Sequence, residues 1–75
     1  MANINYDGLY QACNTIKNRC IGVSFPRLYD ACMRVFQDSA AMAVTFKVNI
    51  NLVGDGYATI YRDGTFTMST QEPEF

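Results

Sequence analysis

The residues that most often carry out chemistry are few in this chain of 75 residues, and histidine is absent. The chain therefore lacks the commonest general base, the usual partner of a catalytic serine or cysteine, and the commonest metal ligand. The soft ligands are Cys13, Cys20 and Cys32. Cys13 and Cys20 would lie about 10 Å apart along a helix, whereas a disulfide needs Cα atoms within about 7 Å. We interpret the cysteines as small buried hydrophobic residues, and expect no metal, no cofactor and no catalytic residue.

The carboxylates also lack a pattern typical of acid–base catalysis. Asp55 and Asp63 flank a predicted strand, and at about 3.3 Å per residue they lie about 25 Å apart, too far to act as a pair. Both stand in sequences typical of turns, where Asp accepts local hydrogen bonds. The Gly54-Asp55-Gly56 segment is too short for a phosphate-binding loop, and no helix follows it. We therefore expect that the chain is not an enzyme.

The charge balance disfavours nucleic acid as a partner. Six basic and seven acidic residues give a net charge of −1, whereas nucleic-acid-binding proteins usually carry a basic excess that neutralises phosphates. A nucleic-acid-associated regulator remains an alternative, because four of the six basic residues gather in the first half of the chain. These four residues are Lys17, Arg19, Arg27 and Arg34.

The composition predicts a folded chain of one domain, residues 1–75, because 49% of the residues are hydrophobic and only 17% are charged. No run reaches the about 18–20 apolar residues of a membrane-spanning helix. Residues 1–5 lack the basic and apolar regions of a signal peptide. We therefore expect no contact with a membrane and a cytoplasmic location, with which an odd number of cysteines without framework spacing agrees.

Two segments in the first half show the period of a helix. In residues 5–20, apolar side chains recur at spacings of three and four, and Asn3 or Asn5 can cap the start. This stripe comprises Tyr6, Leu9, Tyr10, Cys13, Ile16 and Cys20. In residues 25–39, Ser24 is a plausible N-cap and Pro26 lies in the first turn. The second stripe comprises Phe25, Leu28, Tyr29, Cys32, Val35 and Phe36.

The second half alternates between apolar and polar residues, which predicts strands at about residues 43–53, 57–62 and 65–70. Turns are expected at Gly54-Asp55-Gly56 and at Asp63-Gly64. The predicted fold is α+β: two N-terminal helices packed on one face of a three-stranded antiparallel meander, in the order ααβββ.

The length of the two turns decides which side chains face the core, because a one-residue slip exchanges the faces of a strand. With three-residue loops at 54–56 and 62–64, Leu52 faces Ala58, Ile50 faces Ile60, and Ile60 faces Phe66. Tyr57, Thr59 and Tyr61 then point outward. With even loops, these three turn inward and Ile60 faces water. We favour the first register because it buries Ile60 and solvates Arg62. Its core comprises Val44, Phe46, Val48, Ile50, Leu52, Ala58, Ile60, Phe66 and Met68.

The outward face in this register supplies the candidate contact residues for a partner, Tyr57, Tyr61, Lys47 and Asn49, since tyrosine is enriched at interface hot spots. The first strand would also lie at a sheet edge, where unpaired main-chain groups can pair with another chain. A homodimer joined at this edge is therefore a second expectation. Helix residues such as Tyr10, Tyr29 and Met33 offer another route to a dimer.

We infer a small non-enzymatic protein–protein interaction module whose partner is a larger protein or complex. In size and in lack of catalytic groups, the chain is similar to small phage-encoded inhibitors of host machinery, anti-CRISPR proteins among them, which act by blocking a surface. That likeness would imply a host cytoplasm as the site of action. A small-molecule-binding sponge, with a pocket built by a dimer, is the remaining alternative.

Overall fold

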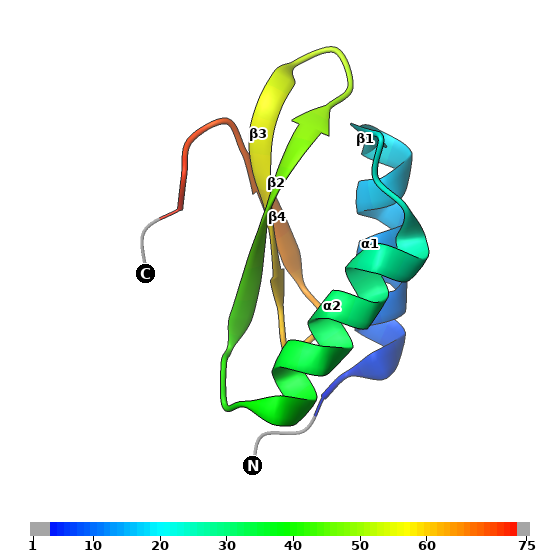
Figure 1. Cartoon of the computed structure of the whole chain (residues 1–75), viewed down its shortest axis with the longest axis vertical. Coiled ribbons are helices and arrows are strands. Elements are labelled where there is room, and N and C mark those ends of the chain that lie inside the picture. Colours follow the sequence, from blue (N-terminus) through cyan, green and yellow to red (C-terminus); the bar gives the residue numbers. More distant parts are fainter. Residues whose placement is uncertain (1–3, 74–75) are drawn as a thin grey trace.

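The computed structural model describes residues 4–73 and places two helices on one side of a four-stranded antiparallel sheet (Figure 1). The elements follow the chain as α1 (Tyr6–Arg19), β1 (Cys20–Ile21), α2 (Phe25–Asp38), β2 (Ala43–Ile50), β3 (Gly54–Tyr61) and β4 (Phe66–Ser69). The strands lie in the sheet in the order β1-β2-β3-β4. The α+β class is therefore confirmed. The predicted count of three strands is wrong, because β1 directly follows α1 and its two residues are too few to show alternation.

The start of α1 is fixed by Asn5, one of the two caps that the sequence predicts. The Asn5 Oδ1 atom accepts a hydrogen bond of 3.0 Å from the Gly8 N–H, which satisfies one free donor of the first helical turn. The predicted apolar stripe is too wide, however, because Tyr6 and Tyr10 are 50% and 56% exposed. The buried residues of α1 are Leu9, Ala12, Cys13 and Ile16.

The second helix also begins where the sequence predicts, and it ends at Asp38, one residue before the predicted end. Ser24 is the N-cap residue, but its side chain makes no capping hydrogen bond. Pro26 lies in the first turn, where a missing N–H costs nothing. The buried face of α2 consists of Leu28, Cys32 and Phe36.

The turn between β2 and β3 occupies residues 51–53, so the prediction of a turn at Gly54-Asp55-Gly56 is wrong. Ile50 pairs with Gly54 instead of Ile60, a shift of six residues along β3. Since the shift is an even number of residues, every side chain keeps its predicted face. The favoured assignment of the two faces is therefore confirmed, although the pairing of these two strands is not.

Gly56 accounts for this error. A Cβ atom at Gly56 would lie 2.6 Å from Ile50 Cδ1 and 2.8 Å from the Ser69 carbonyl oxygen, so glycine is needed inside β3 for close packing and not for a turn. The actual turn contains Leu52 at a φ of 70°, a conformation that non-glycine residues rarely adopt. Leu52 is 99% exposed, so its predicted place in the core, opposite Ala58, is also wrong.

The turn between β3 and β4 has the predicted form. Ile60 pairs with Phe66, and Gly64 has the left-handed φ of 92° that a three-residue loop requires. The Asp63 carboxylate accepts hydrogen bonds from the Thr65 hydroxyl at 2.7 Å and the Thr65 N–H at 3.0 Å. These bonds hold the pKa of Asp63 below its usual value, and the bond from the Thr65 hydroxyl has the larger effect.

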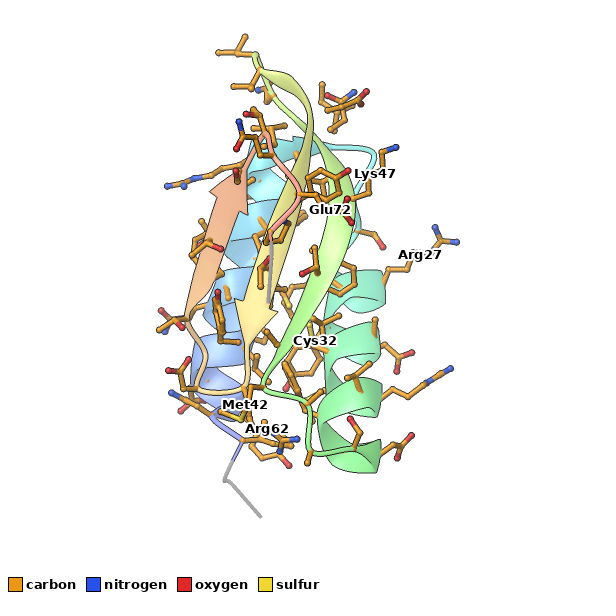
Figure 2. All side chains as sticks on the ribbon, turned by 90° about the vertical axis from the view of Figure 1, so that its left-hand side faces the viewer. Arg27, Cys32, Met42, Lys47, Arg62 and Glu72 are labelled. Atoms are coloured by element: carbon orange, nitrogen blue, oxygen red, sulfur yellow. The ribbon has the colours of Figure 1, made fainter. Side chains whose placement is uncertain are left out.

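Arg62 is buried, with 3% of its surface exposed, so the expectation that it faces water is wrong. Its guanidinium donates hydrogen bonds to the carbonyl oxygens of Phe36 at 2.7 Å, Ser39 at 2.6 Å and Ala41 at 3.1 Å. It also lies 5.3 Å from the centre of the Phe36 ring. The last carbonyl groups of a helix lack partners within the helix, and the helix dipole favours a cation there. Arg62, which directly follows β3, therefore caps the C-terminus of α2, a helix more than 20 residues earlier in the chain. It lies near Met42 in Figure 2.

The core lies between the helical layer and the sheet. Apart from Leu52, every residue predicted for the sheet side of the core belongs to it. Three of them are buried, namely Val48, Ala58 and Ile60. Five are partly buried against the core, namely Val44, Phe46, Ile50, Phe66 and Met68. The opposite face of the sheet is therefore left for polar and aromatic side chains.

Candidate functional site

The four predicted contact residues lie on one face of the sheet, which we call the outer face. It is formed by the side chains of β2 and β3 that point away from the helices, namely Ala43, Thr45, Lys47, Asn49, Asp55, Tyr57, Thr59 and Tyr61. Lys47 pairs directly with Tyr57 across β2 and β3, whereas Asn49 pairs with Asp55. Tyr61 lies at the other end of β3, opposite Ala43. The fold therefore brings Lys47, Asn49 and Tyr57 together. Tyr61 lies on the same face, four residues further along β3 than Tyr57.

A threonine pair that the sequence reasoning did not single out lies between the two tyrosines. Thr59 is only 2% exposed although it belongs to the outer face, and its hydroxyl is 3.1 Å from that of its strand partner Thr45. This cross-strand bond fixes the centre of the face between half-buried Tyr57 and Tyr61. The signal was available in the sequence, because Thr59 alternates with the tyrosines on either side.

The chain after β4 turns back over the outer face. In Figure 1 residues 70–73 lie on the side of the sheet away from the helices, and in Figure 2 they cross in front of the strands. The turn is held by a hydrogen bond of 3.1 Å from the Gln71 N–H to the Ser69 Oγ. Glu72 lies on this segment. Part of the outer face is thus covered by a short segment of the same chain that carries Glu72.

The basic residues that could contact nucleic acid belong to the helical layer and not to the outer face. Lys17 and Arg19 occupy the last turn of α1, and Arg27 and Arg34 project from α2. Arg34 pairs with Asp30 at 3.3 Å, with both side chains about three-quarters exposed, at 74% and 73%. Lys47 is the one cation on the outer face among residues 4–73. A sheet face of this charge does not resemble a phosphate-binding surface.

Two of the three cysteines lie in the core of the described part of the chain. Cys13 and Cys32 are fully buried, and all three cysteines are free. The hydrogen bond to Cys13, together with burial, raises the pKa of Cys32 above its usual value, so this thiol stays protonated and unreactive. Within residues 4–73, no three side chains of the kinds that bind metals come together.

The helical layer carries an aromatic cluster on its outside. Tyr10 meets Phe25 edge-on, with ring centres 4.7 Å apart, and Tyr29 at 6.2 Å. Tyr29 and Met33 line a shallow groove of about 910 Å³ along the outside of α2. The three residues predicted as a dimer contact, Tyr10, Tyr29 and Met33, therefore lie on the helical side, opposite the outer face.

Comparisons with known proteins add no assignment. No protein-family model, curated protein or solved structure matches this chain. Over residues 4–73, no helix has the length and the apolar character that crossing a bilayer requires. The function has to be argued from the surfaces of the molecule.

Proposed function

We propose that this chain is a small non-enzymatic protein–protein interaction module that binds a larger protein or complex through the outer face. The observation that carries the proposal is the common orientation of Tyr57, Tyr61, Lys47 and Asn49 on the one face of the sheet that the helices leave uncovered. The mode of action is surface blocking: the bound module occupies a site that its partner needs for another contact.

The chemistry of the outer face suits a protein partner. Tyrosine offers a large contact area for the loss of few rotatable bonds, and its hydroxyl can form a hydrogen bond once water is removed. The neighbours of the tyrosines on β2 and β3 are mostly neutral, so their desolvation costs less than that of a charged surface. The Thr45–Thr59 bond at 3.1 Å holds the strands between the tyrosines in one arrangement, which reduces the entropy lost on binding.

The charge of Lys47 at one end of the outer face bears on the choice of partner. Its side chain is exposed and lies directly across from Tyr57, and the exposed Asp55, opposite Asn49, lies one pair further along the same face. This end of the outer face therefore carries a cation and an anion. A cation at the rim of an aromatic contact mainly affects the association rate and the choice of partner. We therefore propose that the partner presents charges complementary to Lys47 and Asp55 beside an apolar surface.

Capture of a partner from an extract of the native host tests the proposal. The bait is the full chain, and it is compared with a variant that carries both Tyr57→Ala and Tyr61→Ala. The matched control carries Tyr6→Ala and Tyr10→Ala, because these tyrosines are 50% and 56% exposed on α1. Captured proteins are quantified by mass spectrometry, and circular dichroism checks that each bait is folded.

The proposal predicts a protein that the wild-type chain and the helix control retain and that the double variant of the outer face loses. Hot-spot truncations cost about 2 kcal/mol or more each, so the loss should exceed about tenfold. If no protein is captured specifically, the chain is not an interaction module. If capture depends on Tyr6 and Tyr10 instead, the contact surface is the helical layer.

A further inference from the structure

The outer edge of β2 is paired along only part of its length. β1 pairs Cys20 with Ile50 and Ile21 with Asn49, and then Gly22, at a φ of 74°, turns the chain away from the sheet. Over the part of the chain that the structure describes, residues 43–48 have no strand on that side. The sheet therefore ends there in an exposed edge.

The main-chain groups at this edge can be identified from the alternation of the ladder. The Asn51 N–H donates to the Arg19 carbonyl on the β1 side at 2.8 Å, whereas the Met42 carbonyl accepts from Arg62 on the β3 side. Successive residues of a strand direct their N–H and C=O groups to opposite sides. Ala43, Thr45 and Lys47 therefore present these groups to the open edge, which is a template for an added strand.

A groove runs beside this edge and extends to α2. It has a volume of about 330 Å³, and its lining includes Leu28 and Ala31 from α2 and Phe46 and Val48 from β2. Ligand pockets commonly measure about 300–1,000 Å³, so this groove has room for a few side chains and not for a larger element. A strand added to β2 would direct alternate side chains into it.

The charges around the groove indicate what such a strand carries. Arg27 and Lys47 line the groove, and no carboxylate is among its lining residues. Both side chains project at the same edge of the molecule in Figure 2. Gly22 and Ser24 also line it, next to the first turn of α2, where the helix dipole is positive. A second copy of the chain paired along this edge would bring four cations into one interface, whereas an acidic segment would neutralise them.

We propose that the open edge of β2 and its groove bind an extended acidic segment of a partner protein. The segment adds as a strand antiparallel to β2, in line with β1, with apolar side chains in the groove and a carboxylate near Arg27 and Lys47. This site shares Lys47 with the outer face, but its other contacts are the main-chain edge and the groove, and it does not depend on the function proposed above.

A phage-displayed library of random seven-residue peptides, panned on the full chain, tests this proposal. The decisive variant is Thr45→Pro, which removes an N–H from the open edge, because proline is tolerated where the N–H of an edge strand faces solvent. Thr45→Val is its matched control, since both variants lose the hydroxyl bond to Thr59 and only one loses the N–H. Should Thr45→Pro fail to fold, Ala31→Phe fills the groove from α2 and leaves every main-chain group in place.

The proposal predicts enriched peptides in which Asp or Glu alternates with apolar residues. They should bind the Thr45→Val variant as they bind the wild type, and the Thr45→Pro variant at least about tenfold more weakly. Arg27→Glu should weaken binding further than Arg34→Glu, which makes the same charge change on α2 outside the groove.

Three outcomes would overturn the proposal. The first is that no peptide is enriched, and the second is that the enriched peptides bind Thr45→Pro as tightly as the wild type. The third is a dimer in sedimentation that Thr45→Pro dissociates, which would assign the edge to a second copy of the chain. The two proposals can fail separately. If no peptide binds the edge but a partner is still captured through Tyr57 and Tyr61, this site fails and the outer face does not.

Discussion

The two ends of the sheet are built differently, although each consists of a three-residue turn. At the Arg62 end, residues 62–64 are bonded to segments far away in the chain: the Asn5 N–H donates to the Arg62 carbonyl at 3.2 Å and the Asn5 side chain to the Asp63 carbonyl at 3.0 Å. Arg62 itself caps α2. At the Leu52 end, residues 51–53 are held by the Val53 N–H bond to Ile50 and the Asn51 bond to Arg19.

This difference indicates where the fold is determined. The Arg62 end joins both helices to the sheet, so it fixes how the helical layer covers one face and leaves the outer face free. The Leu52 end contributes exposed apolar side chains, with Leu52 at 99% and Val53 at 61% exposure. We therefore expect substitutions at the Arg62 end to cost far more stability than those at the Leu52 end.

The largest effect is expected from Arg62→Ala. It removes the hydrogen bonds to three carbonyl oxygens, and leaves the buried carbonyl of Phe36 and the part-buried carbonyls of Ser39 and Ala41 without this donor. The expected loss is about 3 kcal/mol or more of the free energy of unfolding, which is most of the stability of a domain this small. Urea unfolding measures it. Arg34→Ala, which removes an exposed ion pair, should change the stability by less than about 1 kcal/mol, and a comparable loss from both variants would contradict the account.

Alanine substitutions at two glycines with similar backbone angles should also cost different amounts of stability at the two ends of the sheet. Gly64 has a φ of 92°, and a Cβ there would lie 2.6 Å from the Gly8 Cα; Gly54 has a φ of 102° and nothing within 4 Å. Gly64→Ala adds a clash between the turn and α1 to the backbone strain of about 1–3 kcal/mol that Gly54→Ala also carries. Thermal unfolding should therefore show a clearly larger fall in Tm for Gly64→Ala. Equal falls would mean that the turn and α1 do not pack closely.

A substitution at the Leu52 end should stabilise the chain. Leu52 holds a φ of 70° with its side chain almost fully exposed, and asparagine tolerates this conformation better than leucine. Leu52→Asn is expected to raise the free energy of unfolding by up to about 1 kcal/mol, measured by urea unfolding. A loss of stability would contradict the account of Leu52 as an exposed residue under backbone strain.

The smallest effect concerns pH at the Arg62 end. The Thr65 hydroxyl and N–H hold the pKa of Asp63 below its usual value, so the folded chain favours the carboxylate and gains stability above the unfolded pKa of about 3.9. This gain disappears as the pH falls through the lower pKa of the folded state. The difference in stability between the wild type and Asp63→Ala should therefore be constant from pH 7 to about pH 5, and shrink below about pH 4. A difference that grows on acidification would contradict the assigned bonds.

Features of the fold that depend on residues close together in the sequence were predicted correctly. The alternation of residues 44–50 gave both the strand and its buried face, and Asp63-Gly64 gave a turn with its left-handed glycine. Asn5 was one of the two candidate helix caps and is the N-cap of α1, whereas the other candidate, Asn3, lies outside the described residues. In each case the residues that decide the structure lie within a few positions of each other.

Features that depend on distant residues were not readable. Gly56 has the appearance of a turn residue, and only its contact with Ser69 from β4 shows that it packs inside a strand. Arg62 was assigned to water because its acceptors lie 21 to 26 residues away in the chain. The contact residues Tyr57 and Tyr61 were assigned to the correct face only because the error in register was an even number of residues.

The most direct test of the outer face as the contact surface uses the five tyrosines of the chain as reporters in NMR spectra. Tyr57 and Tyr61 lie on the outer face, whereas Tyr6, Tyr10 and Tyr29 belong to the helices. On addition of the captured partner, the ring signals of Tyr57 and Tyr61 should shift or broaden while those of the three helix tyrosines stay unchanged. Changes confined to Tyr6, Tyr10 and Tyr29 would contradict the proposed interface.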